Sequence, residues 1–239
     1  MVKAFVIVGL AAVIAATASV EAAEPQRETR SLPAFSRIDI DGQADVTLRQ
    51  GSKEAVTIEA SSQAMPRIHT EVHDNTLVIT PEGQQHWWDW VLGGGRTRTP
   101  RITIDFTRIE RIDAAGAVKV SADSLKADDL RLDLAGACNL RVAELQATRL
   151  RLDGSGAVKA EMGGKVGTQF VDLSGAGSYQ AADLASETAV LRVSGAGKAV
   201  VNVSSKLKVE VSGAGAVEYI GDPKVEQQVS GVAKIRRRE

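Results

Sequence analysis

The chain has 239 residues and a formal net charge of −1, with 44% hydrophobic and 25% charged residues. This balance excludes a disordered tail, a polytopic membrane protein and a basic nucleic-acid-binding protein. Glycine is frequent, with 22 residues, whereas aromatic residues make up only 4% of the chain. A core with so few rings has to be built from aliphatic side chains in thin, regular layers.

Residues 1–22 have the features of a secretory signal peptide. Lys3 precedes an apolar run over residues 4–14, which is too short to span a bilayer. Small residues around Ala22 form a cleavage site, so we predict that the mature chain begins near Ala23. The alternative is an uncleaved membrane anchor. We expect an exported protein, in the periplasm, on the cell surface or secreted, whose mature chain has no transmembrane span.

The first section of the mature chain differs from the rest. After a linker over residues 23–34, residues 35–106 contain strand-like runs that end at turn signals, and a tryptophan-rich insertion covers residues 84–98. We expect less regular β-structure here, covering one end of the repeats that follow. The regular section is predicted over residues 107–235, and a basic tail over residues 236–239.

A repeat of about 19 residues fills the regular section. The intervals between its aligned glycines are 20, 20, 19, 20, 18 and 18 residues. These glycines are Gly116, Gly136, Gly156, Gly175, Gly195, Gly213 and Gly231, and an eighth copy ends at Gly42. A fixed period of this length is typical of solenoid proteins.

Each copy alternates apolar and polar residues before its glycine, as in Leu132-Asp133-Leu134. This two-residue period predicts a strand with one buried and one exposed face. A second short alternating run follows the glycine, and the repeat is too short to hold a crossover helix. The sequence therefore predicts an all-β fold, a parallel β-helix. We expect it to be right-handed, as crossover connections generally are.

Small residues at the corner explain how the coils can stack. Residues 174–177, 194–197 and 212–215 all read Ser-Gly-Ala-Gly. Glycine tolerates positive φ, and without side chains successive coils can approach to about 4.8 Å. We therefore expect the repeat glycines to form a column.

The opening of the mature chain resembles a known family. The runs Phe35–Gly42, Ala44–Gly51, Val56–Ala60 and Val72–Thr80 are similar to the head GIN domain family, DUF2807, which is described as an auto-transporter adhesin. The resemblance covers about residues 35–220. It implies an exported β-helical protein, mostly from Gram-negative bacteria, with no established enzymatic activity. The Gly-Ile-Asn tripeptide behind the family name is absent from this sequence.

Outward-facing charges are the first candidate for a functional surface. In-register coils would align one column, Asp39, Asp113, Asp133, Asp153, Asp172, Arg192, Glu210 and Gln228, beside a second that begins with Arg37, Arg111, Arg131 and Arg151. We expect a solvated ladder of diagonal Arg–Asp ion pairs. The alternative is a calcium site, because adjacent carboxylates offer oxygen ligands.

A second candidate is the segment His86–Gly95, which contains Trp87, Trp88 and Trp90. One interpretation is an apolar plug at the end of the β-helix. The other is a binding loop whose indole rings stack on sugars or insert at a membrane surface. These three tryptophans are the predicted ligand-binding residues.

Two further features favour structural roles. Cys138 occupies a position that is Val118 and Val158 in neighbouring repeats, so we expect a small buried residue rather than a nucleophile. The basic end, Lys234–Glu239, is expected to be solvated and to discourage strand addition. The alternative for this end is contact with anionic lipids or polysaccharide.

The sequence contains no recognisable catalytic or cofactor motif. The three histidines lack a zinc-binding spacing, and Gly154-Ser155-Gly156 is not a nucleophile elbow. We predict a non-enzymatic binding, adhesin-like or scaffolding module of the bacterial envelope, with no cofactor and no catalytic residues. Its partners would be envelope or host glycans or another envelope protein, not nucleic acid, and its coil ends could self-associate. The alternative is a carbohydrate-active β-helix enzyme, a polysaccharide lyase or hydrolase.

Overall fold

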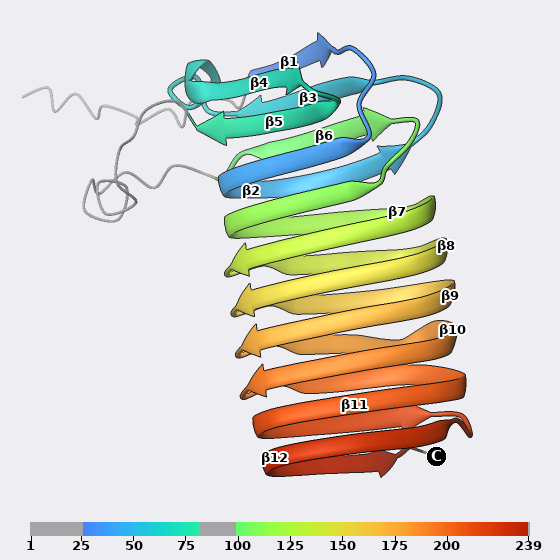
Figure 1. Cartoon of the computed structure of the whole chain (residues 1–239). Helices are drawn as coiled ribbons and strands as arrows, with labels where there is room; N and C mark the ends of the chain where they lie inside the picture. Colours follow the sequence, from blue (N-terminus) through green and yellow to red (C-terminus); the bar gives the residue numbers. More distant parts are fainter. Residues whose placement is uncertain (1–25, 82–98, 239) are drawn as a thin grey trace, which may run out of the picture.

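The computed structural model describes residues 26–81 and 99–238, which form a tall stack of β-coils (Figure 1). The predicted signal peptide with Ala22 and Ala23, and the tryptophan-rich insertion with Trp87, Trp88 and Trp90, lie outside the described residues. Within the described residues the only helical element is the short 3-10 turn η1 (Met65–Arg67). No helix in this part of the chain is long and apolar enough to cross a membrane.

Six consecutive strands build the regular stack, and each pairs in parallel with the next. They are β7 (Arg111–Gly136), β8 (Asn139–Gly156), β9 (Lys159–Gly175), β10 (Ser178–Gly195), β11 (Lys198–Ile220) and β12 (Lys224–Arg237). The strands are long because the backbone hydrogen bonds to the neighbouring coil continue around most of the corners. The predicted parallel β-helix is confirmed.

The repeat glycines form the predicted column. Gly136 pairs with Gly156, Gly156 with Gly175, and Gly175 with Gly195. The φ angles of the eight glycines in the column lie between 93° and 122°. At four corners the residue after the glycine donates a backbone hydrogen bond to the glycine of the previous coil, as from Ala137 N to Gly116 O at 2.8 Å. A side chain in place of Gly136 would point at the carbonyl oxygen of Gly116.

Aliphatic side chains fill the interior in columns of their own. One column lies four residues before the repeat glycines. Its members are all buried: Ile38, Ile112, Leu132, Leu152, Val171, Leu191 and Val209. Cys138 belongs to a neighbouring inward column and is 3% exposed, as predicted. The core is therefore a stack of thin aliphatic layers.

One coil reverses the rule that places apolar side chains inside and polar ones outside. Gln169 is fully buried at the inward position that Leu150 holds one coil earlier. Its amide accepts a hydrogen bond from Tyr179 Oη at 2.9 Å and donates one to Ser186 Oγ at 2.8 Å. The next residue, Phe170, faces outward and is 39% exposed. The register is kept because Val171 and Leu173 remain buried.

The irregular section contributes the first coils. β2 (Arg37–Gln50) is the eighth copy of the repeat, and it pairs in parallel with β7 along residues 37–48. On its other edge β2 pairs with two separate strands, β5 (Thr76–Pro81) and β6 (Arg101–Phe106). β5 pairs with residues 37–40 of β2, and β6 pairs with residues 45–50.

Antiparallel strands close this end of the stack, where less regular β-structure was predicted (Figure 1). β4 (Ile68–His73) pairs with β5, while β3 (Ala55–Ala60) pairs with β6 and with β1 (Gln26–Ser31). β1 lies in the segment that we predicted as a linker. It is ordered by its ladder with β3 and by Arg30, which donates hydrogen bonds from β1 to Ile68 O and Thr70 Oγ1 in β4.

The opposite end of the stack is open. β12 pairs with β11 alone, and Val229 and Val232 in β12 are 45% and 81% exposed. The predicted basic tail is shorter than expected, because Arg236 and Arg237 belong to β12 and pair with Glu218 and Asp222. The two ends of the solenoid are therefore chemically different.

Replacing Gly136 with alanine will destabilise the stack. The new Cβ would lie 2.6 Å from Gly116 O, and alanine would have to adopt a φ of 93°. Backbone strain alone costs about 1–3 kcal/mol. Urea unfolding followed by circular dichroism should show a clear fall in the midpoint. Gly51→Ala is the control, because nothing lies within 4 Å of its Cβ, and an equal fall for both variants would contradict the column argument.

Gln169→Leu, which restores the residue type of the preceding coil, is expected to lower the free energy of unfolding. The substitution leaves the buried Tyr179 hydroxyl without its acceptor, which costs about 1–3 kcal/mol. Adding Tyr179→Phe removes the stranded hydroxyl and should recover most of the loss. A double-mutant cycle measured by urea unfolding tests this, and additive losses would show that the two side chains are not coupled.

Candidate functional site

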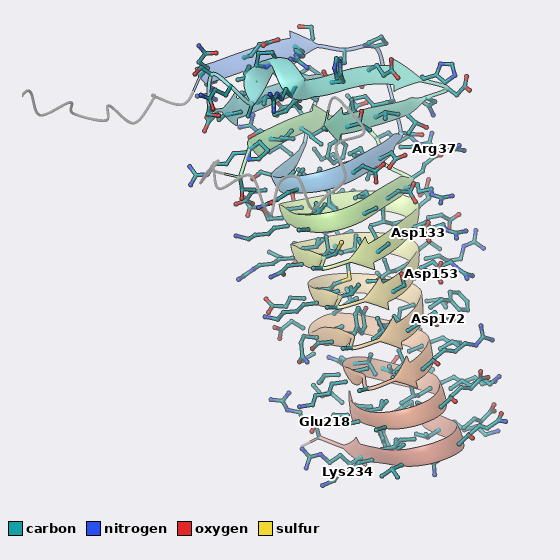
Figure 2. All side chains as sticks on the ribbon, turned by 90° about the vertical axis from the view of Figure 1, so that its left-hand side faces the viewer. Arg37, Asp133, Asp153, Asp172, Glu218 and Lys234 are labelled. Carbon is teal, nitrogen blue, oxygen red and sulfur yellow. The ribbon has the colours of Figure 1, made fainter. Side chains whose placement is uncertain are left out.

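The outward aspartates form the predicted column. Asp39 pairs in register with Asp113, and Asp133, Asp153 and Asp172 occupy the same position in successive coils. Figure 2 shows the last three one above another along one side of the stack. The column follows from the two-residue period of the strand, which turns these side chains outward between two buried aliphatic ones. The spacing of the coils sets the spacing of the carboxylates, about 4.8 Å.

Arginines hold these carboxylates in two ways. Within a strand, Arg131 donates hydrogen bonds to Asp133 from Nε at 2.8 Å and from Nη2 at 3.2 Å. Between coils, Arg111 reaches Asp133 at 2.9 Å and Arg131 reaches Asp153 at 3.4 Å. The diagonal pairs were predicted. The pairs within a strand were not, although residues two apart in a strand share a face.

The ion pairs change the pKa values along the column. Partial burial tends to raise the pKa of Asp133, but the hydrogen bonds and charges of Arg131 and Arg111 outweigh it and lower the pKa below its usual value. At the N-terminal end, burial together with the charges of Asp41 and Asp113 raises the pKa of Asp39. The charge of the column is therefore firmly balanced in its middle and less so at its N-terminal end.

The two charged columns change character after three regular coils. Phe170 takes the place of the next arginine beside Arg151, and Asp172 makes no ion pair with any described residue. Arg192 then replaces an aspartate and pairs with Glu210 at 3.0 Å. The continuous ladder thus covers β7, which carries Asp113 and Asp133, and β8, which carries Asp153.

The aspartate column lines a shallow, open groove of about 410 Å³, with Ala115, Ala135, Ser155 and Ser174 along its side. The calcium alternative finds little support there, because Asp113, Asp133 and Asp153 already bind guanidinium groups. Within residues 26–81 and 99–238, no cluster of three or more His, Cys, Asp or Glu side chains could hold a metal ion.

A larger open groove, of about 1030 Å³, lies at the next corner of the coils. It runs from Thr107 across three coil steps to Phe170. Buried Ile109, Leu130 and Leu150 lie at its base. No motif in the sequence predicts this groove. Its only signal in the sequence is the exchange of polar and apolar residues at positions 169 and 170.

The remaining candidates have structural surroundings. Burial raises the pKa of the Cys138 thiol, which lies 3.3 Å from Ala135 O. Ser155, Ser174, Ser194, Ser212 and Ser230 form a column in register. The described histidines, His69 and His73, lie in β4, in the closing strands rather than beside these serines.

Asp133→Asn is expected to lower the free energy of unfolding by about 0.5–1 kcal/mol at pH 7 and low salt, because the pairs are partly exposed. A lowered pKa in the folded state stabilises the protein above the unfolded pKa of about 3.9. That contribution disappears as the pH falls through the folded value, so the difference between the two proteins should shrink as the pH falls below about 3.9. Asp172→Asn is the matched control. Equal losses at pH 7, measured by urea unfolding, would contradict the ladder.

Several solved structures are similar to this chain. A putative adhesin from Bacteroides fragilis superposes with a TM-score of 0.83 at 20% identity, over 90% of this chain and 97% of the other. A putative lipid binding protein from Parabacteroides distasonis gives a TM-score of 0.73 at 16% identity, with 90% and 97% coverage. A putative adhesin from Parabacteroides merdae gives 0.69 at 19%, with the same coverage.

These likenesses, all at low identity, support the fold. No curated protein is significantly similar to the chain. The family model described as "Putative auto-transporter adhesin, head GIN domain" matches residues 34–223, which is most of the sequence and includes every coil up to the start of β12. The chain belongs to this family, DUF2807.

Proposed function

We propose that the protein is an exported, non-enzymatic, adhesin-like binding module of the bacterial envelope. Its family and two of the solved structures that it resembles carry adhesin names. A rigid solenoid suits this work, because its outward side chains stand at fixed heights and can meet an extended ligand along the stack.

The observation that carries the proposal is the state of the charged column. A polysaccharide hydrolase needs a carboxylic acid with a raised pKa to protonate the leaving group. Asp133 has the opposite property, since two arginines lower its pKa and keep it ionised. In the middle of the column Asp113, Asp133 and Asp153 are engaged by arginines, which favours binding over glycoside hydrolysis there.

The tryptophan-rich insertion is the proposed recognition element. In the sequence the insertion lies between β5 and β6, which pair with β2 on either side of Gly42. Trp87, Trp88 and Trp90 supply flat rings suited to stacking on sugars.

A glycan-array screen of the exported chain tests this function. We expect the wild-type protein to bind a subset of glycans, and a variant with Trp87, Trp88 and Trp90 all replaced by alanine to lose most of that signal. Uniformly absent binding for both proteins would contradict glycan recognition. Turnover of acidic polysaccharides that is lost in Asp133→Ala would instead favour the enzyme alternative.

A further inference from the structure

The exposed ring of Phe170 is the starting observation. Single exposed apolar residues are common on protein surfaces. A buried polar side chain directly beside an exposed aromatic ring is unusual, and it can mark a functional surface. Here Gln169 is buried and Phe170 is 39% exposed, whereas the two preceding coils place leucine inside and arginine outside at these two positions.

This reversal is built into the coil rather than a slip of register. The flanking Val171 and Leu173 remain inside, and every buried polar atom of Gln169 is satisfied by Tyr179 and Ser186. A one-residue shift would expose the whole inward set of this strand. The coil therefore keeps a polar group in the core and an aromatic ring in solvent at the same time.

Phe170 forms the end of the larger groove, which has fixed walls. Arg108 pairs with Glu110 at 3.0 Å, and Arg149 pairs with Asp129 in the neighbouring coil. The rim is held by Gln50, whose side chain accepts a hydrogen bond from Lys126 N at 2.7 Å and donates to Lys126 O at 3.0 Å. The groove is thus a prearranged surface.

Cationic side chains outnumber anionic ones along the groove, five against three. The four arginines among them are engaged by carboxylates, Arg108 and Arg149 within the lining and Arg131 and Arg151 by Asp133 and Asp153 beside it. The cationic residues are Arg108, Lys126, Arg131, Arg149 and Arg151. The ammonium group of Lys126 makes no ion pair with any described residue, so it remains available to an incoming carboxylate.

The shape favours an extended chain. Three coil steps separate the level of Glu110 from that of Phe170, a length of about 14 Å along the stack. An aromatic face at one end, an unpaired ammonium group on the wall and an open trough between them suit a short run of acidic sugars.

We propose that this groove binds an acidic polysaccharide, with the Phe170 ring stacked on one sugar and Lys126 facing an acidic group. The proposal rests on the binding function proposed above, and it adds a second recognition surface, on the described coils and distinct from the tryptophan-rich insertion. Arg149 and Asp129 supply neighbouring hydrogen-bond donors and acceptors for sugar hydroxyls.

Titration calorimetry of the exported chain with polygalacturonate, and with neutral dextran as comparison, tests the proposal. We expect binding to polygalacturonate that weakens with added salt, and markedly weaker binding to dextran. Phe170→Thr should weaken binding by about tenfold, because the stacking ring is lost. Val190→Thr is the matched control, since Val190 follows Phe170 in the same outward column and does not line the groove.

Lys126→Gln tests the charge, with Lys198→Gln, exposed on another face, as its control. Lys126→Gln should weaken polygalacturonate binding several-fold at low salt, and the control should not. Absent binding of the wild type to polygalacturonate, or equal effects of Phe170→Thr and Val190→Thr, would overturn the proposal. Tryptophan-dependent binding on the glycan array together with either result would leave the general binding function intact.

Discussion

The backbone hydrogen bond across the glycine corner is the interaction on which this structure depends. At four successive turns the residue after the glycine donates to the glycine carbonyl group of the coil before it, as Ala157 does to Gly136 at 2.8 Å. The same carbonyl lies where a side chain would be if the glycine were replaced. Close approach of the coils and a positive φ are thus required at one position, and glycine is the residue that permits both.

The fixed distance between coils also sets the spacing of the side chains that face outward. Residues that share a repeat position lie at nearly equal heights, so a charge in one coil must be balanced by its neighbours. Arg111 and Arg131 do so by binding an aspartate in their own strand and one in the next coil. The result is a surface whose charges are mostly neutralised locally, on which a departure such as Phe170 is conspicuous.

Much of the fold could be predicted because its determinants repeat. The glycine spacing and the alternation around residues such as Asp133 specify strand, face and register together, and the structure has all three. The strand β1 could not be predicted, because Gln26–Ser31 has no apolar alternation and gains its order from pairing with β3 and from Arg30. Features that depend on partners distant in the chain leave little local signal.

The candidate surfaces divide in the same way. The aspartate column followed directly from the repeat, whereas the larger groove depends on side chains from several coils at a corner with no distinctive motif. Its one local sign, Gln169-Phe170, reads as a misplaced pair until Tyr179 and Ser186 are seen to satisfy the amide. A sequence can mark such an exception, but it cannot show what compensates for it.

The two unlike ends give the solenoid a direction of assembly. Antiparallel strands finish the N-terminal end, while β12 leaves one ladder edge without a partner. A chain that emerges N-terminus first completes its closed end early, and each later coil then meets a finished template as it appears. Growth of this kind needs no long search for distant partners, which suits a polypeptide that folds as it is delivered.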